Sequence, residues 1–230
     1  MRHERTPAFG VIFDMDGVLI DSADAHWESW RRLGEENGVP VAHEQFTTTF
    51  GRQNSDIIPI LFGEVAPKKG QALSQRKEAI YRDLIRKEPP IVAGAVELVH
   101  ALHAAGTALA VGSSGTRENI DLVLGAMSVA DAFSAIVSSD DITRGKPDPQ
   151  VFQLSTQRLG IPPRQCIVIE DAPAGVQAAK AAGAYAVAVL IHHPRQAFPE
   201  ANCTVDRLAE LSLDQLRALV GDSRGVKRGG

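Results

Sequence analysis

Two aspartates, Asp14 and Asp16, stand one residue apart directly after an apolar run that begins at Val11. Side chains at positions i and i+2 of an extended segment point to the same side, so both carboxylates can serve one site if the extended conformation continues that far. Two acids at one site indicate metal binding, acid–base chemistry or both. Aspartate is also a common turn and helix-capping residue, so the pair alone leaves a purely structural role open.

Polar residues also follow three later apolar runs. They are Ser113 with Ser114, the segment 138–141 leading to Lys146, and Glu170 with Asp171. Because the carboxyl ends of parallel strands meet along one edge of a sheet, these residues can share a site with the first two aspartates. Acidic oxygens for a hard cation, hydroxyl donors for phosphate oxygens and one fixed positive charge suit a phosphoryl group held by Mg²⁺.

A parallel sheet is needed to bring these residues together, and the second part of the chain predicts one. Helical periodicity alternates there with short, wholly apolar strands. We expect helices near 94–105, 116–126, 149–159, 173–182 and 212–220, and strands at 108–112, 135–138, 166–169, 185–190 and 203–205. This alternation is typical of β-α-β units around a sheet that is buried on both faces. The predicted fold class is therefore α/β, with a doubly wound, Rossmann-like parallel sheet as its core.

The segment 21–90 has a different pattern, without a strand. Helical periodicity runs from Ser22 to Gly38, and shorter helices are expected at roughly 43–50, 53–62 and 71–87, with breaks at Gly51, at Gly63 and at a turn over 67–70. Two successive prolines, Pro89 and Pro90, end the segment. We expect 21–90 to be an all-helical cap domain, inserted into a core made of 1–20 and 91–230, that covers the site. Residues 221–230 resemble a frayed tail.

The composition excludes several classes of function. The chain has 230 residues, of which 44% are hydrophobic and 23% charged, as in ordinary globular proteins. A net charge of −4, without a basic cluster, disfavours nucleic-acid binding. The two cysteines, Cys166 and Cys203, lie in apolar contexts typical of core residues rather than a disulfide, which fits a reducing cytoplasm. Neither a signal peptide nor a membrane-spanning run is evident. We expect a cytoplasmic monomer.

Taken together, the four polar motifs resemble those of the haloacid dehalogenase-like (HAD) hydrolase superfamily. The motifs occur in the family's order, as Asp14-Met15-Asp16-Gly17, Ser113, Lys146 before a proline, and Glu170-Asp171. The resemblance covers nearly the whole chain. Within the superfamily, the chain is most similar to the β-phosphoglucomutase-like and sugar-phosphatase group, which carries a C1 helical cap between the first two motifs. It implies a Mg²⁺-dependent phosphatase that hydrolyses a small phosphorylated metabolite, such as a sugar phosphate, through an aspartyl-phosphate intermediate.

The resemblance also implies a role for each core residue. Asp14 is the expected nucleophile, and Asp16 the expected acid and base, which requires Asp16 to start protonated while Asp14 is ionised. Mg²⁺ is expected on the Asp14 carboxylate, the Asp16 backbone carbonyl and Asp171, with Glu170 bound directly or through water. The phosphoryl oxygens are expected to contact Ser113, Lys146 and the backbone N–H groups of Met15 and Ser114. In isolation, the serines also fit a loop and helix cap, and the lysine an exposed position.

Two residues of the predicted cap resemble functional positions of the mutase, and at a third position the chain departs from it. His26 corresponds to a histidine that takes part in cap closure and proton transfer, and Lys77 to a cap lysine. Where the mutase has an arginine that grips the distal phosphate, this chain has Asn54, with Arg52 two positions earlier. That departure favours a phosphatase over a phosphomutase. A simpler interpretation is that His26 packs between two tryptophans and that Lys77 lies on a solvated helix face.

Three further functions remain open from the sequence. A phosphomutase is the second choice. A 2-haloacid dehalogenase is disfavoured by Asp16, and a non-catalytic binding module by the full set of catalytic residue types. Asp140 and Asp141 fit either the surroundings of the site or a simple turn. His192 and His193 are adjacent, so their side chains diverge and a shared metal ion is not expected.

Overall fold

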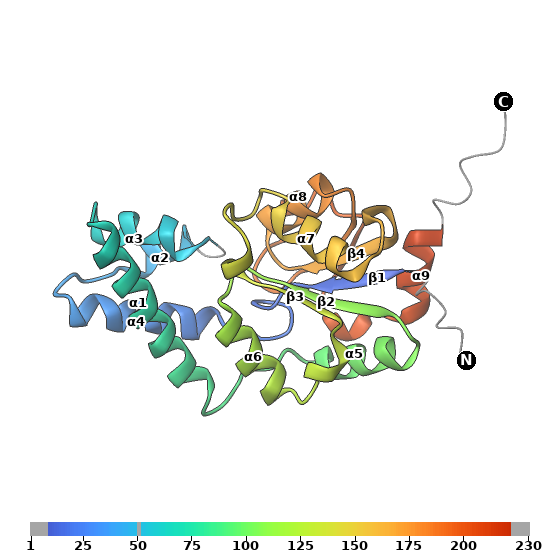
Figure 1. Ribbon diagram of the computed structural model, residues 1–230, viewed down its shortest axis with the longest axis horizontal. Helices are drawn as coiled ribbons and strands as arrows, with labels where there is room; N and C mark the ends of the chain where they lie inside the picture. The colour runs from blue at the N-terminus through green and yellow to red at the C-terminus, as the bar shows by residue number, and fades with distance from the viewer. Residues whose placement is uncertain (1–8, 50–51, 222–230) are drawn as a thin grey trace.

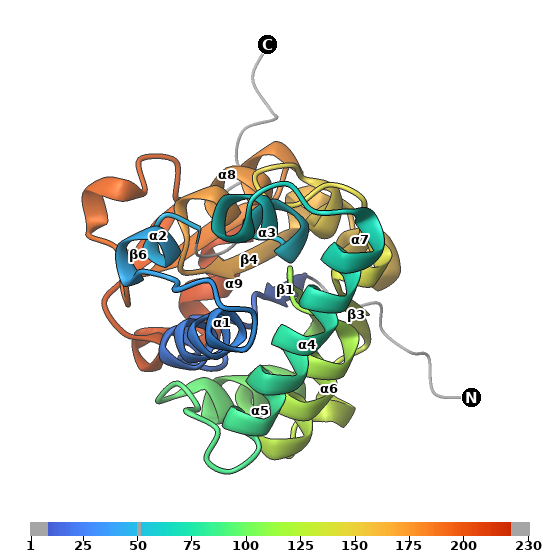
Figure 2. The ribbon, with the colours of Figure 1, turned by 90° about the vertical axis from the view of Figure 1, so that its left-hand side faces the viewer.

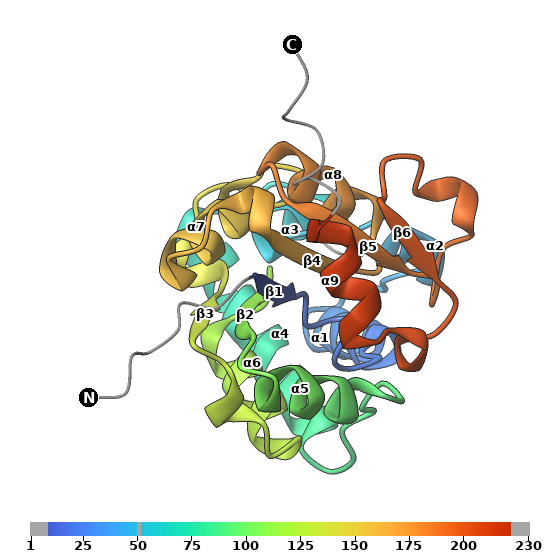
Figure 3. The same ribbon diagram turned by 90° about the vertical axis from the view of Figure 1, so that its right-hand side faces the viewer.

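The computed structural model describes residues 9–49 and 52–221. Its centre is a parallel sheet of six strands in the order β3-β2-β1-β4-β5-β6 (Figures 1 and 3). The strands are β1 (Gly10–Phe13), β2 (Ala108–Gly112), β3 (Ala135–Val137), β4 (Cys166–Glu170), β5 (Tyr185–Val189) and β6 (Cys203–Val205). The chain starts in the middle of the sheet and builds outward in both directions, so the strand order reverses between β1 and β4. Open α/β sheets bind their ligands beyond such a reversal point.

Helices cover both faces of the sheet (Figures 1 and 3). One face carries α5 (Ala95–Ala104), α6 (Arg117–Ala126) and α9 (Leu213–Gly221), and the other carries α7 (Gln150–Leu159) and α8 (Pro173–Ala181). Along β1, Val11 and Phe13 pack into the first layer and Ile12 into the second, because successive side chains of a strand point to opposite faces. The predicted doubly wound α/β core is confirmed.

Four helices lie beyond the carboxyl edge of the sheet (Figures 1 and 2). They are α1 (Ala23–Glu36), α2 (His43–Thr47), α3 (Asn54–Phe62) and α4 (Pro67–Ile85), and they share a hydrophobic cluster of their own around Trp30 and Leu33. No strand is present in the described part of 21–90. The predicted turn over 67–70 is wrong: these residues form the first turn of α4, where a proline has no hydrogen bond to lose. The predicted break at Gly51 lies outside the described residues.

The helical segment leaves the core and returns to it at one place. Ile20 and Ile91 form an antiparallel bridge, the Asp21 N–H donates to the Pro90 carbonyl at 2.8 Å, and the Val92 N–H donates to the Leu19 carbonyl at 3.0 Å. The two connections therefore run side by side. At the other end of the chain, residue 221 still belongs to α9, and the rest of the predicted tail lies outside the described residues. No helix within the described ranges is long and apolar enough to cross a bilayer.

Candidate active site

The first aspartate is held at the end of the central strand. The Asp14 N–H continues the ladder by donating to the Ile169 carbonyl at 3.0 Å, and the side chain is buried. The chain then turns at Gly17, whose φ of 77° favours glycine. A Cβ atom at Gly17 would also overlap the carboxylate of Asp171. This turn therefore brings the backbone after β1 directly against the acid that follows β4.

Three buried acids form a cluster where β1 and β4 end. Oxygen atoms of Asp14, Glu170 and Asp171 all lie within 4.8 Å of one another. Oδ2 of Asp171 is buried and has no hydrogen-bond partner among residues 9–49 and 52–221. Several carboxylate oxygens aimed at one point suit a hard divalent cation, so these residues fit Mg²⁺. The Asp16 carboxylate is not part of the cluster, as expected for a residue whose backbone carbonyl would bind the ion.

Lys146 supplies the positive charge of this cluster. Its Nζ lies 2.9 Å from Asp14 Oδ1 and 2.5 Å from Glu170 Oε1, and its side chain is only 5% exposed. An exposed position for this lysine is thereby ruled out. The other oxygen of Glu170 accepts from the backbone N–H groups of Asp171 and Ala172, at 3.1 and 3.0 Å. One lysine facing three carboxylates leaves a net negative site, which suits a bound cation.

The cluster shifts the pKa values of its members. Burial raises the pKa of Asp14 to about 7, against the attraction of Lys146. Burial also raises the pKa of Asp171 well above its usual range, with repulsion from Glu170 and Asp14 adding to the effect. A divalent cation among these carboxylates would favour their ionised forms and lower both pKa values.

The loop after β2 brings hydroxyl and backbone donors to the same edge. Ser113 is buried, and its Oγ accepts from the Gly115 N–H at 2.9 Å. Oγ of Ser114 is buried without a hydrogen-bond partner in the part of the chain that the structure describes. The helix cap is Thr116, which accepts from the Asn119 N–H at the start of α6. The two serines are therefore not the cap residues, and the loop presents its polar groups to the site. The Met15 side chain is fully buried, leaving its backbone as the polar part.

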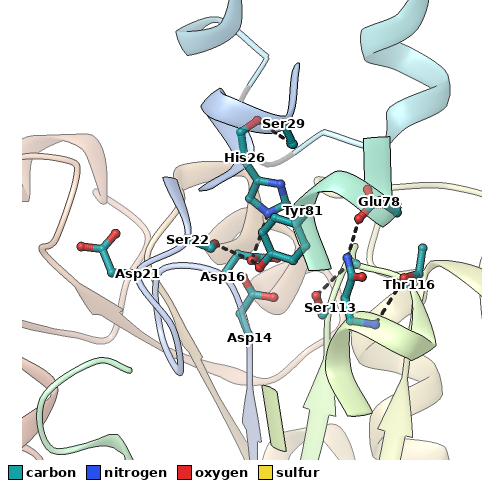
Figure 4. Close-up of polar contacts among 12 residues, drawn as sticks. Asp14, Asp16, Asp21, Ser22, His26, Ser29, Glu78, Tyr81, Ser113 and Thr116 are labelled. Carbon is teal, nitrogen blue, oxygen red and sulfur yellow. Dashed lines mark hydrogen bonds and ion pairs between the residues drawn. The ribbon is translucent and has the colours of Figure 1, made fainter. Parts of the chain in front are cut away.

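Asp16 contacts the helical segment. Its Oδ1 accepts hydrogen bonds from Ser22 Oγ at 2.5 Å, from His26 Nε2 at 3.1 Å and from the Tyr81 hydroxyl at 3.2 Å (Figure 4). Burial raises the pKa of Asp16, but attraction to His26 and the hydrogen bonds from His26 and Ser22 outweigh it and lower the pKa to about 2. The pKa shifts of Asp14 and Asp16 in these surroundings therefore run in the opposite order to the one that the expected roles require. The three donors could not be placed beside Asp16 from the sequence.

His26 and Lys77 are brought together from α1 and α4. Nζ of Lys77 lies 2.7 Å from Nδ1 of His26, and the imidazole stacks on the Tyr81 ring with centroids 4.2 Å apart. The Lys77 side chain is 2% exposed and its ammonium lies 5.5 Å from the ring centroid of Trp30. A solvated helix face is therefore ruled out for Lys77, because α4 packs this face against α1.

A cavity of about 530 Å³ joins the two groups of residues. Its lining includes Asp14, Asp16 and Lys146 on the core side and His26, Lys77 and Arg52 on the helical side. Asn54 also lines it, but its amide donates to Ser74 Oγ at 3.0 Å and to Glu78 Oε1 at 2.7 Å, within the helical segment. The volume is in the range of small-molecule sites. Of the predicted site residues, all but Met15 and Ser113 line this cavity.

Two acids and one histidine that the sequence singled out do not contribute to this cavity. The Asp140 carboxylate accepts from the Arg117 N–H, and Asp141 pairs with Arg158 at 2.5 Å, so both are turn and capping residues. His192 pairs with Asp21 at 3.1 Å, whereas His193 lines the cavity, and the two do not form a metal pair.

Sequence reasoning missed four polar residues of the site. They are Ser22, Glu78, Tyr81 and Asn119, which contact Asp16 or the groups around Lys77. Tyr81 had a signal, since it follows Lys77 by four residues and therefore shares its helix face.

Comparisons with known proteins agree with this geometry. A model of the family "Haloacid dehalogenase-like hydrolase" matches residues 11–189. The validoxylamine A 7'-phosphate phosphatase of Streptomyces hygroscopicus subsp. limoneus is 32% identical over 204 residues, covering 87% of this chain and 94% of that protein. The β-phosphoglucomutase of Bacillus subtilis (strain 168) is 32% identical over 214 residues, covering 90% and 92%. The crystal structure of a β-phosphoglucomutase from Clostridium difficile shares the fold, with a TM-score of 0.84, 23% identity, and coverage of 94% of this chain and 98% of that chain.

Proposed function

Since the chain belongs to the haloacid dehalogenase-like hydrolase family and is a phosphatase, we propose that it hydrolyses a small sugar phosphate with Mg²⁺ and through an aspartyl-phosphate on Asp14. The observation that carries the proposal is the buried cluster of Asp14, Glu170 and Asp171 with Lys146 at its edge. Such a cluster has no evident purpose in an ordinary core, because burying three carboxylates around one lysine costs free energy.

The core residues divide the chemistry between them. Mg²⁺ held by Asp14, Asp171 and the Asp16 carbonyl, with Glu170 direct or through water, would supply charge neutralisation for the phosphoryl group. The Asp14 carboxylate attacks phosphorus in line, and the leaving oxygen departs on the opposite side. Lys146, Ser113 and the N–H groups of Met15 and Ser114 hold the phosphoryl oxygens. Water then attacks the phosphorus of the aspartyl-phosphate, releasing phosphate and restoring Asp14.

Asp16 serves both steps as acid and base, and its surroundings determine where its proton comes from. With a pKa near 2, its carboxylate is ionised in this arrangement, so it must gain a proton before the leaving oxygen departs. His26 Nε2 is in contact with Asp16 Oδ1, and histidine is the side chain that exchanges protons near neutral pH. We assign His26 the role of passing this proton. The same contact keeps Asp16 ready to accept the proton of the attacking water.

The substrate class follows from the cavity and from the relatives. The volume of the cavity suits a monosaccharide phosphate. Its lining includes the aromatic residues Trp30 and Phe46 and the hydroxyl-bearing residues Thr47 and Thr48. Two relatives carry names that refer to phosphorylated sugar-like molecules, validoxylamine A 7'-phosphate and phosphoglucose. Arg52 in the same lining is placed to attract a second polar group of the substrate.

The helical segment acts in this proposal as a cap. We propose 21–90 as the cap domain and 1–20 with 91–230 as the core domain, working as a cytoplasmic monomer on a free metabolite. The cap supplies His26, Lys77, Arg52 and Asn54, and the core supplies the phosphoryl chemistry. The adjacent connections at Ile20 and Ile91 serve as its hinge.

Phosphomutase activity is the second candidate, favoured by the 32% identity to a β-phosphoglucomutase. A mutase must hold the second phosphate of a bisphosphate intermediate. Here the amide of Asn54, at the position of the mutase arginine, is engaged by Ser74 and Glu78, which supports hydrolysis instead. Incubation with β-glucose 1-phosphate and a trace of the 1,6-bisphosphate distinguishes the two. Glucose 6-phosphate as the main product would establish the mutase, and free phosphate the phosphatase.

A panel of phosphorylated metabolites tests the main proposal. Each compound is incubated with the purified protein and Mg²⁺, and released phosphate is measured, with Asp14→Asn as the control for contaminating phosphatases. We expect one or a few sugar phosphates to be hydrolysed with a kcat/KM well above that of the rest. Preference for nucleotides or phosphopeptides over every sugar phosphate would overturn the substrate class.

A further inference from the structure

A buried carboxylate lies at the boundary between α4 and α6, and the proposed mechanism does not use it. Glu78 is 6% exposed. Its Oε1 accepts from Lys77 Nζ at 2.9 Å and from Asn54 Nδ2 at 2.7 Å, and its Oε2 accepts from Asn119 Nδ2 at 2.5 Å. Three donors from three elements therefore fix both oxygens of this carboxylate.

The donor from α6 ties Glu78 to the core. Asn119 is 1% exposed and belongs to the first turn of the helix that follows the Ser113–Ser114 loop. Its backbone N–H is bonded to the cap residue Thr116, and its Oδ1 accepts from Arg82 Nη1 at 3.0 Å. The amide of Asn119 thus contacts two side chains of α4 at once. Glu78 is oriented by a core helix that begins beside the phosphoryl site.

On its other side, Glu78 faces the residues that contact Asp16. The Lys77 ammonium lies between Glu78 Oε1 and His26 Nδ1 and can donate to both. An Nδ1 atom that accepts from a lysine leaves the ring proton on Nε2, which points at Asp16 Oδ1. The carboxylate of Glu78 is the counter-ion of this buried lysine. The charge of this carboxylate offsets most of the free-energy cost of burying the ammonium.

We propose that Glu78 is a positioning residue for proton transfer, because its carboxylate, oriented by Asn119, holds the Lys77 ammonium against His26. As the His26 Nε2 proton passes to Asp16, a Lys77 proton passes to His26 Nδ1, so the ring stays neutral, and the protons return along the same path after Asp16 has taken the proton of the attacking water. The inference rests on the proposed phosphatase function and adds to it a residue that need not touch the substrate. It predicts that Glu78 affects the step in which the leaving oxygen is protonated more than it affects substrate binding.

Substrates with different leaving groups test this role. The nitrophenolate of p-nitrophenyl phosphate departs without a proton, whereas the alkoxide of a sugar phosphate needs one. We compare Glu78→Gln, which keeps the shape but removes the charge, with wild-type protein. The matched control is Asp83→Asn, which removes an exposed carboxylate of the same helix. Circular dichroism establishes that each variant is folded.

We expect Glu78→Gln to lower kcat at least tenfold for the best sugar phosphate of the panel and less than threefold for p-nitrophenyl phosphate, with KM nearly unchanged. Asp83→Asn should change neither. Equal losses on both substrates would show a merely structural role and overturn the inference, as would an unchanged kcat on the sugar phosphate. If Glu78→Gln does not fold, Asn119→Ala decides: it should shift the ratio of the two rates in the same direction, and an unchanged ratio would overturn the inference.

A measurement without turnover separates this inference from the proposed function. In protein that is free of substrate, the ¹⁵N chemical shifts of the His26 ring report which nitrogen carries the proton, and His26→Gln assigns the signals. We expect Nε2 to carry the proton in wild type and the two ring signals to move toward each other in Glu78→Gln. If they do so while no phosphate ester is hydrolysed, the proposed function fails and the positioning role stands. Unchanged signals would overturn the positioning role even in an active phosphatase.

Discussion

Nζ of Lys146 lies 2.9 Å from Oδ1 of Asp14, although the two residues come from loops after different strands. The lysine thereby contacts one carboxylate oxygen of the proposed nucleophile. Its own pKa is raised, because attraction to Asp14 and Glu170 outweighs the effect of burial. This contact therefore lies where the proposed function places the nucleophile, the metal ion and the phosphoryl group.

Replacement of Asp14 by asparagine should abolish phosphate release. An amide is no nucleophile toward phosphorus, so we expect kcat to fall by more than about a thousandfold while the fold is retained. Phosphate release and circular dichroism measure the two effects. Asp140→Asn serves as the control, because the Asp140 carboxylate accepts from the Arg117 N–H and from Ser138 Oγ, Asp140 does not line the cavity, and its replacement should leave kcat within about twofold. Near-normal activity of Asp14→Asn would remove this residue from the mechanism.

Activity should require a divalent cation bound at the acidic cluster. A chelator should eliminate phosphate release, and added Mg²⁺ should restore it. Asp171→Asn should raise the Mg²⁺ concentration needed for half-maximal activity by at least about tenfold, since a buried Asp171 oxygen at the cluster has no hydrogen-bond partner among the described residues. Titration of activity with Mg²⁺ measures this shift. Full activity in the chelator would contradict the cofactor assignment.

Removal of the Lys146 charge should destabilise the protein. In Lys146→Met, Asp14 and Glu170 lose the cation between them, and uncompensated buried charge costs about 3 kcal/mol in the free energy of unfolding. Urea unfolding in a chelator measures this loss, and Mg²⁺ should recover part of it by binding the folded state. Lys87→Met, at an exposed position, is the control. Equal stability of both variants would mean that the ion pairs contribute nothing.

The Glu78 carboxylate should make the stability depend on acid pH. Burial raises its pKa, but attraction to Lys77 and His26 and bonds from Asn54 and Asn119 lower it from 4.5 to about 2. A lowered pKa in the folded state stabilises the protein above pH 4.5, and this contribution is lost as the pH falls toward 2. The shift corresponds to at most about 3 kcal/mol.

Urea unfolding at pH 6, 4 and 3 checks this dependence. The difference in free energy of unfolding between wild type and Glu78→Gln should shrink steadily as the pH falls, because the other carboxylates titrate alike in both proteins. A constant difference over this range would show that Glu78 does not keep its low pKa.

The sheet could be predicted from the sequence because its strands are short apolar runs, and β2, β3 and β4 each lie between helices. The run at 108–112, for example, matches β2 to the residue. The start of α4 could not be placed, since Pro67 and Gly70 are turn formers in isolation and are tolerated in a first helical turn only when the following residues continue the helix. The packing of α4 on α1 stabilises the helical conformation of these residues over a turn.

The core site followed from the strand ends, whereas the cap side did not. One rule, that parallel strands end along a common edge, predicts that these residues share a site: Asp14, Ser113, Lys146 and Glu170. The position of the Lys77 side chain depends instead on how α1 and α4 pack against each other, and no local sequence pattern determines that packing. The low pKa of Asp16 has the same origin, because its donors come from α1, α4 and the hinge.

The paired connections at Ile20 and Ile91 have a consequence for how such a chain can evolve. A segment whose two ends are already joined imposes little extra loop-closure entropy on the sheet, whatever its length. Insertions, deletions and even whole replacements within 21–90 are then compatible with an unchanged register of β1 and β2. On the proposed division of roles, exchange of this helical segment would change the substrate and leave the core residues as they are.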